Sequence, residues 1–277
     1  MRRMETVFLN HGGGPMPLLG NDDATAADLR SLAHIGPTPA AILVISAHWA
    51  VRSGYAVTAA MNPPMLFDYA GFPPESYRYS YAAPGDPALA ARVASLVSGA
   101  GLGPCALDAE RGFDHGVFVP LMLAYPEATI PVLALSLSAR LDAATHLALG
   151  SALRPLRDEG VLIIGSGSSY HNMGTLMSRL GGRGGAAAGR AFDDALVAAC
   201  TAASASARSD SLANWTRFPG ARDAHPRGGE EHLMPLFVVA GAAGTDRGVA
   251  VNRVKLMGAA HMSSFVFGSA GGETCEA

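Results

Sequence analysis

The sequence is poor in cysteine, in charged residues and in long apolar runs. Its 277 residues include three cysteines, Cys105, Cys200 and Cys275, an odd number without close spacing. Neither a disulfide framework nor a cysteine-based zinc site is therefore indicated. Charged residues make up only 16%, the net charge is −3, and no block of Lys and Arg stands out. Nucleic acids and anionic membrane surfaces are consequently poor candidate partners.

Signals for export or membrane insertion are also missing. The basic residues Arg2 and Arg3 are followed by too short an apolar run for a signal peptide. No stretch reaches the ~18 apolar residues that span a bilayer. The longest, Leu233–Gly244, is interrupted by Pro235 and predicts a buried helix instead. We therefore expect a globular, cytoplasmic protein.

Short β-branched runs alternate along the chain with segments rich in Ala and Leu. Hydrophobic residues make up 49%, enough for a sizeable core. The predicted strands are Thr6–Leu9, Ala41–Ser46, Val132–Leu137 and Val161–Ile164. The predicted helices are Ala24–Ala33, Pro87–Ser98, His115–Ala124, Ala143–Arg157 and Gly189–Ala203. Continuous apolar strands alternating with helices predict an α/β fold, with a central, largely parallel or mixed sheet flanked by helices. We expect a single domain over residues 1–277.

The glycine-rich segments do not match nucleotide-binding motifs. Neither the spacing GxGxxG nor GxxxxGK[ST] follows the first strand. The segment Gly165-Ser166-Gly167-Ser168 also lacks the Gly-x-Ser-x-Gly spacing of a hydrolase nucleophile. A long irregular segment, Asn62–Pro84, is rich in Pro and aromatic residues and predicts a binding wall with Phe67, Tyr69 and Phe72.

Three of the nine histidines stand just after predicted strands. His11 follows the first strand, His48 the second, and His171 follows Val161–Ile164 after a Gly/Ser turn. In open α/β sheets, ligands bind outside the carboxyl ends of the strands, so these three side chains are expected at one rim. Neutral imidazole is the commonest metal ligand, and two histidines with a third N or O donor suit Zn(II) or Fe(II).

Two further histidines are candidates for the same site. His232 follows Glu231 at the start of the predicted buried helix, and either side chain could supply the third metal ligand. His115 follows Asp114, which either orients the ring for acid/base work or caps the next helix. Asp68 could face the cleft, although a loop aspartate more often caps a turn.

Seven short segments, in this order, resemble class III extradiol ring-cleavage dioxygenases of the DOPA-dioxygenase-type branch, within the LigB-like superfamily. Together they span residues ~8 to ~240, most of the chain. They are Phe8-Leu9-Asn10-His11-Gly12, Ser46-Ala47-His48-Trp49, Asp68-Tyr69-Ala70-Gly71-Phe72-Pro73, Tyr81-Ala82-Ala83-Pro84-Gly85, Gly112-Phe113-Asp114-His115-Gly116, His171-Asn172 and Glu231-His232-Leu233-Met234-Pro235-Leu236.

The resemblance implies a mononuclear non-haem Fe(II) site that opens the ring of a catechol with O2, with Zn(II) as the alternative metal. By position, His11 and His48 match the metal histidines of the family and His232 its third ligand, with Glu231 as the competitor. His171 matches the acid/base histidine and can also touch the metal. His115 matches a second histidine of the pocket. The pair Gly228-Gly229 departs from the family pattern beside the third ligand and is expected to loosen that loop.

Two other classes compete with the dioxygenase. One is a catalytically silent relative that keeps the histidines as a binding site for metal or peptide. The other is a zinc-dependent hydrolase, although the sequence has no HExxH motif to supply its general base. No motif in the sequence indicates which catechol is cleaved, the regiochemistry of cleavage or the oligomeric state. Arg78 or Arg227 could pair with a substrate carboxylate, although each is more simply a surface arginine.

Overall fold

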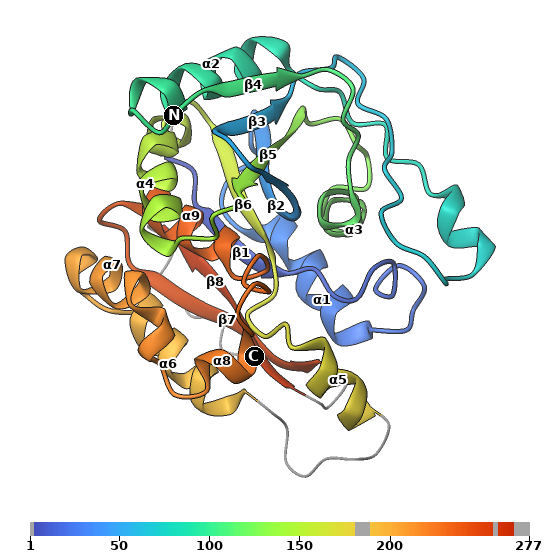
Figure 1. The fold of residues 1–277 in the computed structure, drawn as a ribbon. Coiled ribbons are helices and arrows are strands. Elements are labelled where there is room, and N and C mark those ends of the chain that lie inside the picture. Colours follow the sequence, from blue (N-terminus) through green and yellow to red (C-terminus); the bar gives the residue numbers. More distant parts are fainter. Residues whose placement is uncertain (1–2, 181–188, 257–259, 269–277) are drawn as a thin grey trace.

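A mixed eight-stranded sheet forms the centre of the computed structural model, which describes residues 3–180, 189–256 and 260–268 (Figure 1). Its strand order is β4-β3-β5-β2-β6-β1-β8-β7. The strands are β1 Thr6–Asn10, β2 Ala41–Val51, β3 Tyr55–Thr58, β4 Cys105–Asp108, β5 Val132–Ser138, β6 Val161–Gly167, β7 Gly248–Leu256 and β8 Ala260–Phe267. The four central strands β5, β2, β6 and β1 are parallel, whereas β8 is antiparallel to β1 and to β7. The predicted fold class is confirmed.

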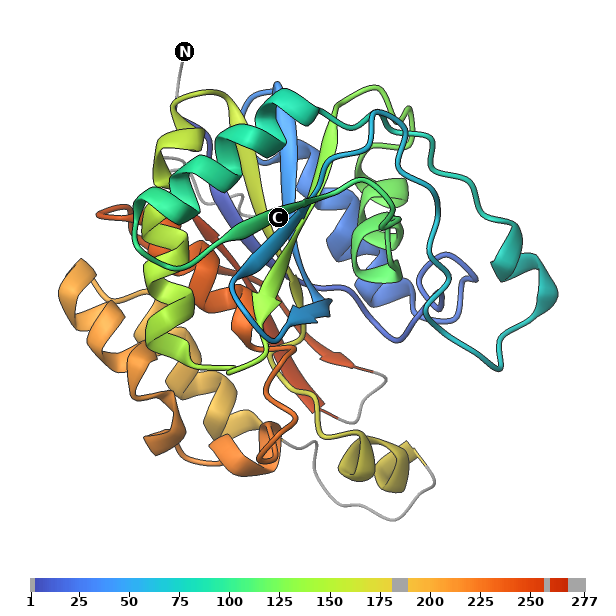
Figure 2. The same ribbon diagram turned by 45° about the horizontal axis from the view of Figure 1, so that its top comes forward.

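Helices cover both faces of the sheet (Figures 1 and 2). The helices are α1 Asp23–Ser31, α2 Pro87–Gly99, α3 His115–Ala124, α4 Ala143–Leu153, α5 Met173–Leu180, α6 Arg190–Cys200, α7 Ala205–Ala213, α8 Ala221–Ala224 and α9 Met234–Ala243. Short 3-10 turns occupy Leu32–His34, Pro74–Arg78, Arg154–Arg157 and Trp215–Arg217. Helices α4 and α9 lie on one face, and α1 and α3 lie on the other.

Strand β2 shows why the central strands are apolar throughout. Successive side chains of a strand point to opposite faces, so Leu43 and Ile45 enter the core under α4 and α9. Ile42 and Val44 enter the second core, under α1 and α3. All four side chains are fully buried. A strand covered on both faces therefore reads as a continuous apolar run, as the sequence predicted.

The structure adds four strands that the sequence analysis missed, and each of the four predicted strands ends later than expected, β2 by the most. Strands β3 and β4 have four residues each, too few for a periodic signal. Strand β7 at the edge of the sheet and its neighbour β8 carry mixed polar and apolar residues. Strand β2 runs to Val51 rather than ending at Ser46, with an irregularity between Ile45 and Ala50 in its pairing with β5.

Further predictions from the sequence concern the long apolar segment, the cysteines and membrane-spanning helices. The apolar segment at 233–244 forms α9, which is buried along its whole length and has Pro235 in its first turn. Cys105 and Cys200 are free, and Cys275 lies outside the described residues. Among the helices formed by the described residues, none is both long and apolar enough to cross a membrane.

Helices α4 and α9 approach each other closely through glycine. A Cβ atom built on Gly150 of α4 would overlap the carbonyl oxygen of Val238, and one built on Gly241 of α9 would overlap that of Leu147. These contacts are with backbone, which cannot rotate away as a side chain can. The two glycines therefore set the distance between the helices, and with it the position of α9 against β6 and β1.

Replacing Gly150 with Ala is expected to lower the free energy of unfolding by about 1–3 kcal/mol or more, because the added methyl group forces the helices apart. The measurement is urea unfolding followed by circular dichroism. Gly99→Ala is the control: Gly99 ends α2 with open space around its Cβ position, so its stability should change by less than about 1 kcal/mol. Equal stability of Gly150→Ala and the wild-type protein would contradict the close packing.

Candidate metal and active site

Five histidines from distant parts of the chain line one cavity of about 390 Å³. His11 directly follows β1, His48 lies in β2, and His171 follows β6, and these three strands are neighbours in the sheet. His115 is the first residue of α3, and His232 stands two residues before α9. The expected convergence at the carboxyl ends of the strands therefore occurs. His48 differs in one respect, because it lies within its strand rather than after it.

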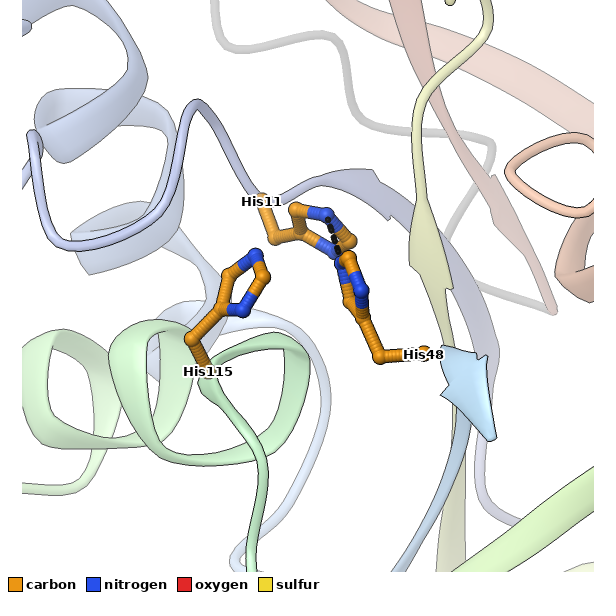
Figure 3. A group of neighbouring side chains, drawn as sticks. All are labelled: His11, His48 and His115. Carbon is orange, nitrogen blue, oxygen red and sulfur yellow. Dashed lines mark hydrogen bonds between the residues drawn. The ribbon is translucent and has the colours of Figure 1, made fainter. Parts of the chain in front are cut away.

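Within the cavity the rings are closely spaced. The Nε2 atoms of His11 and His48 lie 3.2 Å apart, and His115 points toward the same space (Figure 3). The ring centroids of His48 and His115 are 3.9 Å apart. Those of His171 and His232 are 3.4 Å apart, with the rings stacked. The ring centroid of His232 also lies 4.9 Å from that of His48, so the five imidazoles form one continuous cluster.

Two glycines of β6 allow the segment that carries His232 to reach the cluster. A Cβ atom on Gly167 would overlap the carbonyl oxygen of His232, and one on Gly165 would lie 2.6 Å from that of Pro235. The same His232 carbonyl accepts a hydrogen bond from the backbone N–H of Ser168, at 2.9 Å. The Gly-x-Gly pattern of this strand therefore has a structural role: it brings a residue 65 positions later to the rim.

The orientation of His11 follows from a buried serine. The Ser166 hydroxyl donates to the carbonyl oxygen of Gly116, so its own oxygen is left to accept from His11 Nδ1, at 2.9 Å. This places the ring proton of His11 on Nδ1 and leaves the Nε2 lone pair facing the cavity. Such an outer hydrogen bond commonly fixes the tautomer of a metal-binding histidine.

Asp68 serves two of the rings at once. Its Oδ1 accepts from Nδ1 of His115 at 2.8 Å and from the backbone N–H of the same residue at 3.0 Å. Its Oδ2 lies 3.5 Å from Nδ1 of His48. Burial alone would raise the pKa of Asp68, but the hydrogen bonds from His115 outweigh it and lower the pKa to about 2. The carboxylate that orients His115 is therefore Asp68 and not the adjacent Asp114.

Glu231 lies between two further rings, those of His232 and His171, as Asp68 lies between His115 and His48. Its Oε1 lies 3.0 Å from Nδ1 of His232 and 3.5 Å from Nδ1 of His171. Burial favours the protonated acid, but the hydrogen bonds from His171 and His232 dominate and hold the pKa of Glu231 well below its ordinary value. The turn before it is tied down, because the Glu230 carboxylate accepts from the backbone N–H of Gly228 and from Arg222. Gly228-Gly229 therefore does not leave this loop loose.

Asp114 supports the strand that carries His48. It is fully buried at the start of α3 but makes no side-chain capping bond there. Instead, its carboxylate accepts from the Ser46 hydroxyl at 2.7 Å and from Arg111 at 2.9 Å. The guanidinium of Arg111 also lies over the ring of Trp49, 4.5 Å from its centroid. These residues on both sides of His48 fix the irregular part of β2.

The inner histidines are held in the neutral state. Burial, followed by the neighbouring imidazoles, lowers the pKa of His48 to about 2 and that of His11 well below its ordinary value. Burial also lowers the pKa of His232 to about 4, although Glu231 opposes the shift. Two Nε2 lone pairs facing each other at 3.2 Å repel unless a proton or a cation lies between them. Neutral rings with converging Nε2 atoms fit a divalent metal ion.

Among the described residues, two groups of three side chains have ligand atoms within 4.8 Å of one another. The first is His11, His48 and His115, and the second is His171, Glu231 and His232. The five histidines singled out from the sequence thus line one cavity, with His232, the expected third ligand, in the second group and His11 and His48 in the first. The geometry also adds Ser166 and a supporting role for Asp68, which sequence reasoning missed because both contacts join segments far apart in the chain.

Of the other residues singled out from the sequence, some line the cavity and some do not. His225 is fully buried among aromatic side chains, and its Nε2 donates to the carbonyl oxygen of Ser169 at 3.0 Å, away from the cluster. Tyr69 and Phe72 line the cavity as predicted, whereas Phe67 does not line it and packs against Phe118. Arg78 and Arg227 are exposed and do not line the cavity.

The chain is similar to a family of ring-opening dioxygenases and to curated proteins named dioxygenases. Residues 25–268 match the family described as the catalytic LigB subunit of aromatic ring-opening dioxygenase, a match that begins after His11. Among curated relatives, 4,5-DOPA dioxygenase extradiol of Beta vulgaris is 42% identical over 245 residues, covering 87% of each chain. The dioxygenase tasH of Hapsidospora irregularis is 41% identical over 256 residues, covering 86% of this chain and 77% of its own length.

A solved structure is also similar. The crystal structure of an uncharacterized protein from Escherichia coli K12 superimposes with a TM-score of 0.75 at 32% sequence identity. The similarity covers 96% of the present chain and 100% of the other.

The hydrogen bonds of Ser166 predict the tautomer of His11. In the metal-free protein at neutral pH, His11 should carry its proton on Nδ1. Long-range ¹⁵N–¹H NMR of the imidazole nitrogens measures which nitrogen is protonated. Ser166→Ala should weaken this preference because the acceptor is removed, while the Nδ1–H signal of His232, which rests on Glu231, stays in place. An Nε2–H tautomer at His11 in the wild-type protein would contradict the proposed orientation.

Proposed function

The chain belongs to the family of the catalytic LigB subunit of aromatic ring-opening dioxygenases, and on this basis we propose that it opens the ring of a catechol at a metal held by His11, His48 and His232. It is an extradiol ring-opening enzyme. The observation that carries the location of the chemistry is the cluster of five imidazoles that line one cavity, in which the Nε2 atoms of His11 and His48 lie 3.2 Å apart. A silent binding protein and a zinc hydrolase are not favoured, since the relatives are named dioxygenases.

The third ligand is proposed to be His232 rather than Glu231. The Oε1 atom of Glu231 already faces the Nδ1 atoms of two rings, His232 and His171. A carboxylate in that position orients imidazoles and stabilises their charge, as the outer partners of metal-binding histidines do. Nε2 of His232 remains available for the metal. This arrangement supports an all-histidine ligand set.

The proposed metal is Fe(II), with Zn(II) as the alternative. Three neutral nitrogen donors suit either ion. Bound there, Fe(II) would supply open coordination positions for the two catechol oxygens and for O2, and would pass electrons from the catecholate to O2.

His171 is proposed as the general base and acid. Its ring lines the cavity beside His232, where it can take the proton of a catechol hydroxyl on Nε2. The resulting imidazolium would be stabilised by Glu231, 3.5 Å from Nδ1, and could return the proton to the product. His115 has Nδ1 fixed by Asp68, so its Nε2 is directed to donate or accept a hydrogen bond at the bound reactants.

The surroundings of the cluster suit a planar substrate. Tyr69 and Phe72 form an aromatic wall whose rings lie 5.5 Å apart, and Gly14 packs against the Phe72 ring. The glycines of the segment 12–14 keep side chains out of this part of the cavity. A catecholate ring would therefore lie between the aromatic wall and the imidazoles. A cytoplasmic location and the lack of nucleic-acid or membrane partners stay predictions from composition.

Two substitutions test the ligand set by metal affinity. His232→Ala should abolish Fe(II) or Zn(II) retention after dialysis, as should His48→Ala, because each removes one of three protein ligands. Glu231→Gln should weaken affinity only about 10- to 100-fold, the typical cost of losing an outer partner. Metal content is measured by plasma emission spectroscopy, and affinity by competition with a chelator. The reverse order, with Glu231→Gln more damaging than His232→Ala, would make Glu231 the ligand.

Turnover tests the function itself. The protein is prepared without oxygen, loaded with Fe(II) and mixed with catechols in air, while oxygen uptake and the yellow absorbance of a ring-opened product are followed. We expect one O2 consumed per ring opened. His171→Ala should retain most of its metal but lose at least about 100-fold in kcat, because proton transfer is removed. Absence of oxygen uptake from a protein that holds one iron would reject the proposed function, and full activity of His171→Ala would reject its base.

A further inference from the structure

The wall of the cavity beyond the histidines is apolar. It is formed by six side chains from four parts of the described chain: Met16, Met173, Leu176, Met177, Leu256 and Met262. Three of them belong to α5, which begins two residues after His171. Within the described ranges, the residues that line the cavity include no Lys, Arg, Asp or Glu. Among these described lining residues, a charged group on the substrate would therefore find no oppositely charged side chain.

The hydroxyl groups of the lining are already used within the protein. The Ser168 hydroxyl donates to the carbonyl oxygen of Tyr170 at 2.7 Å, and its oxygen also lies 3.2 Å from the Met262 sulfur. The Tyr69 hydroxyl donates to the carbonyl oxygen of Ser76 at 2.6 Å. The Tyr170 hydroxyl donates to Asp223 at 3.2 Å. The imidazoles are thus the polar side chains of this lining that remain free to meet a ligand.

Helix α5 presents its methionines at the edge of this wall. Met173 and Met177 are 50% and 63% exposed, while Leu176 between them is almost fully buried. Residues four apart lie on the same side of a helix, so the two methionines stand next to each other. Methionine is flexible and polarizable, which suits contact with apolar groups of varied shape. Figure 1 shows α5 at the margin of the fold, apart from the helices that cover the sheet.

We propose that the substrate is a catechol whose ring substituent is uncharged and apolar, an alkyl or aryl group, and that Met173, Leu176 and Met177 hold this substituent. The proposal rests on the proposed function for the position of the diol at the histidines. The substituent then extends past His171 toward α5, where it covers the exposed methionines. A carboxylate or an amino-acid side chain in the same place would lose part of its hydration without a charged partner among the described lining residues.

The first test compares two diols of similar length, 4-propylcatechol and 3-(3,4-dihydroxyphenyl)propionate, with the Fe(II)-loaded protein. We expect kcat/KM to be at least about tenfold higher for the propyl compound, because the carboxylate is desolvated without compensation. An equal or higher value for the propionate would overturn the proposal, and would indicate that main-chain groups such as those of residues 12–14 hold the anion. Turnover of neither diol would count against the proposed function instead.

Binding without turnover provides an independent readout. Calorimetric titration of the metal-free protein with 4-propylphenol and with 3-(4-hydroxyphenyl)propionate needs neither iron nor oxygen. Tighter binding of the propyl compound by about tenfold or more supports the apolar wall even if no diol is cleaved. Tighter binding of the propionate overturns it.

A substitution in α5 should change this preference. Met173→Lys places a cation at the half-exposed edge of the wall and should lower the propyl-to-propionate ratio of kcat/KM by at least about threefold. Met173→Leu keeps the position apolar and should leave the ratio unchanged. Met61→Lys is the matched control, because Met61 is 63% exposed and does not line the cavity. The same change in the ratio for Met61→Lys, or an unchanged ratio for Met173→Lys, would overturn the role of α5.

Discussion

The arrangement of the site depends on two carboxylates that are each shared by two histidines. Asp68 lies between His48 and His115, and Glu231 lies between His232 and His171. In each pair, one ring is a proposed metal ligand and the other a proposed partner of the reactants. A single carboxylate thus fixes the rotation of a ligand and of the neighbouring catalytic ring together. Crowding five imidazoles into one buried cavity is tolerable because the inner ones are neutral, because the two carboxylates face the Nδ1 atoms of four rings, and because Ser166 accepts from Nδ1 of His11.

Much of this arrangement could be predicted from the sequence. The four central strands are continuous apolar runs because both faces of the sheet are covered, and histidines after such strands must meet at one rim. His115 and His232 stood out in the sequence because they follow Asp114 and Glu231 at the starts of predicted helices, and the family motifs then implied their roles. All five residues do line the same cavity. Their assignment to metal binding and proton transfer stays a proposal.

Other features could not be predicted, for physical reasons that can be stated. Strands β3 and β4 are too short to show alternation, and their place is set by pairing with β5 and with each other. The contact of Asp68 with His115 joins residues 47 positions apart, and Asp68 stands in an irregular segment where spacing carries no information. Likewise, the adjacent Asp114 was the obvious partner of His115, but burial beside Ser46 and Arg111 turns its carboxylate away.

The order of the site residues along the chain has a consequence for how the protein is made. His11 precedes His232 by more than 200 residues, yet β1 pairs with β6 and β8, and His232 reaches the rim only when its segment packs over the glycines of β6. A nascent chain on the ribosome therefore holds His11 and His48 without His232 until the segment around residue 232 has emerged. Capture of a metal by the proposed ligand set must wait for that segment, so a chain truncated before residue 232 would leave an incomplete set of donors.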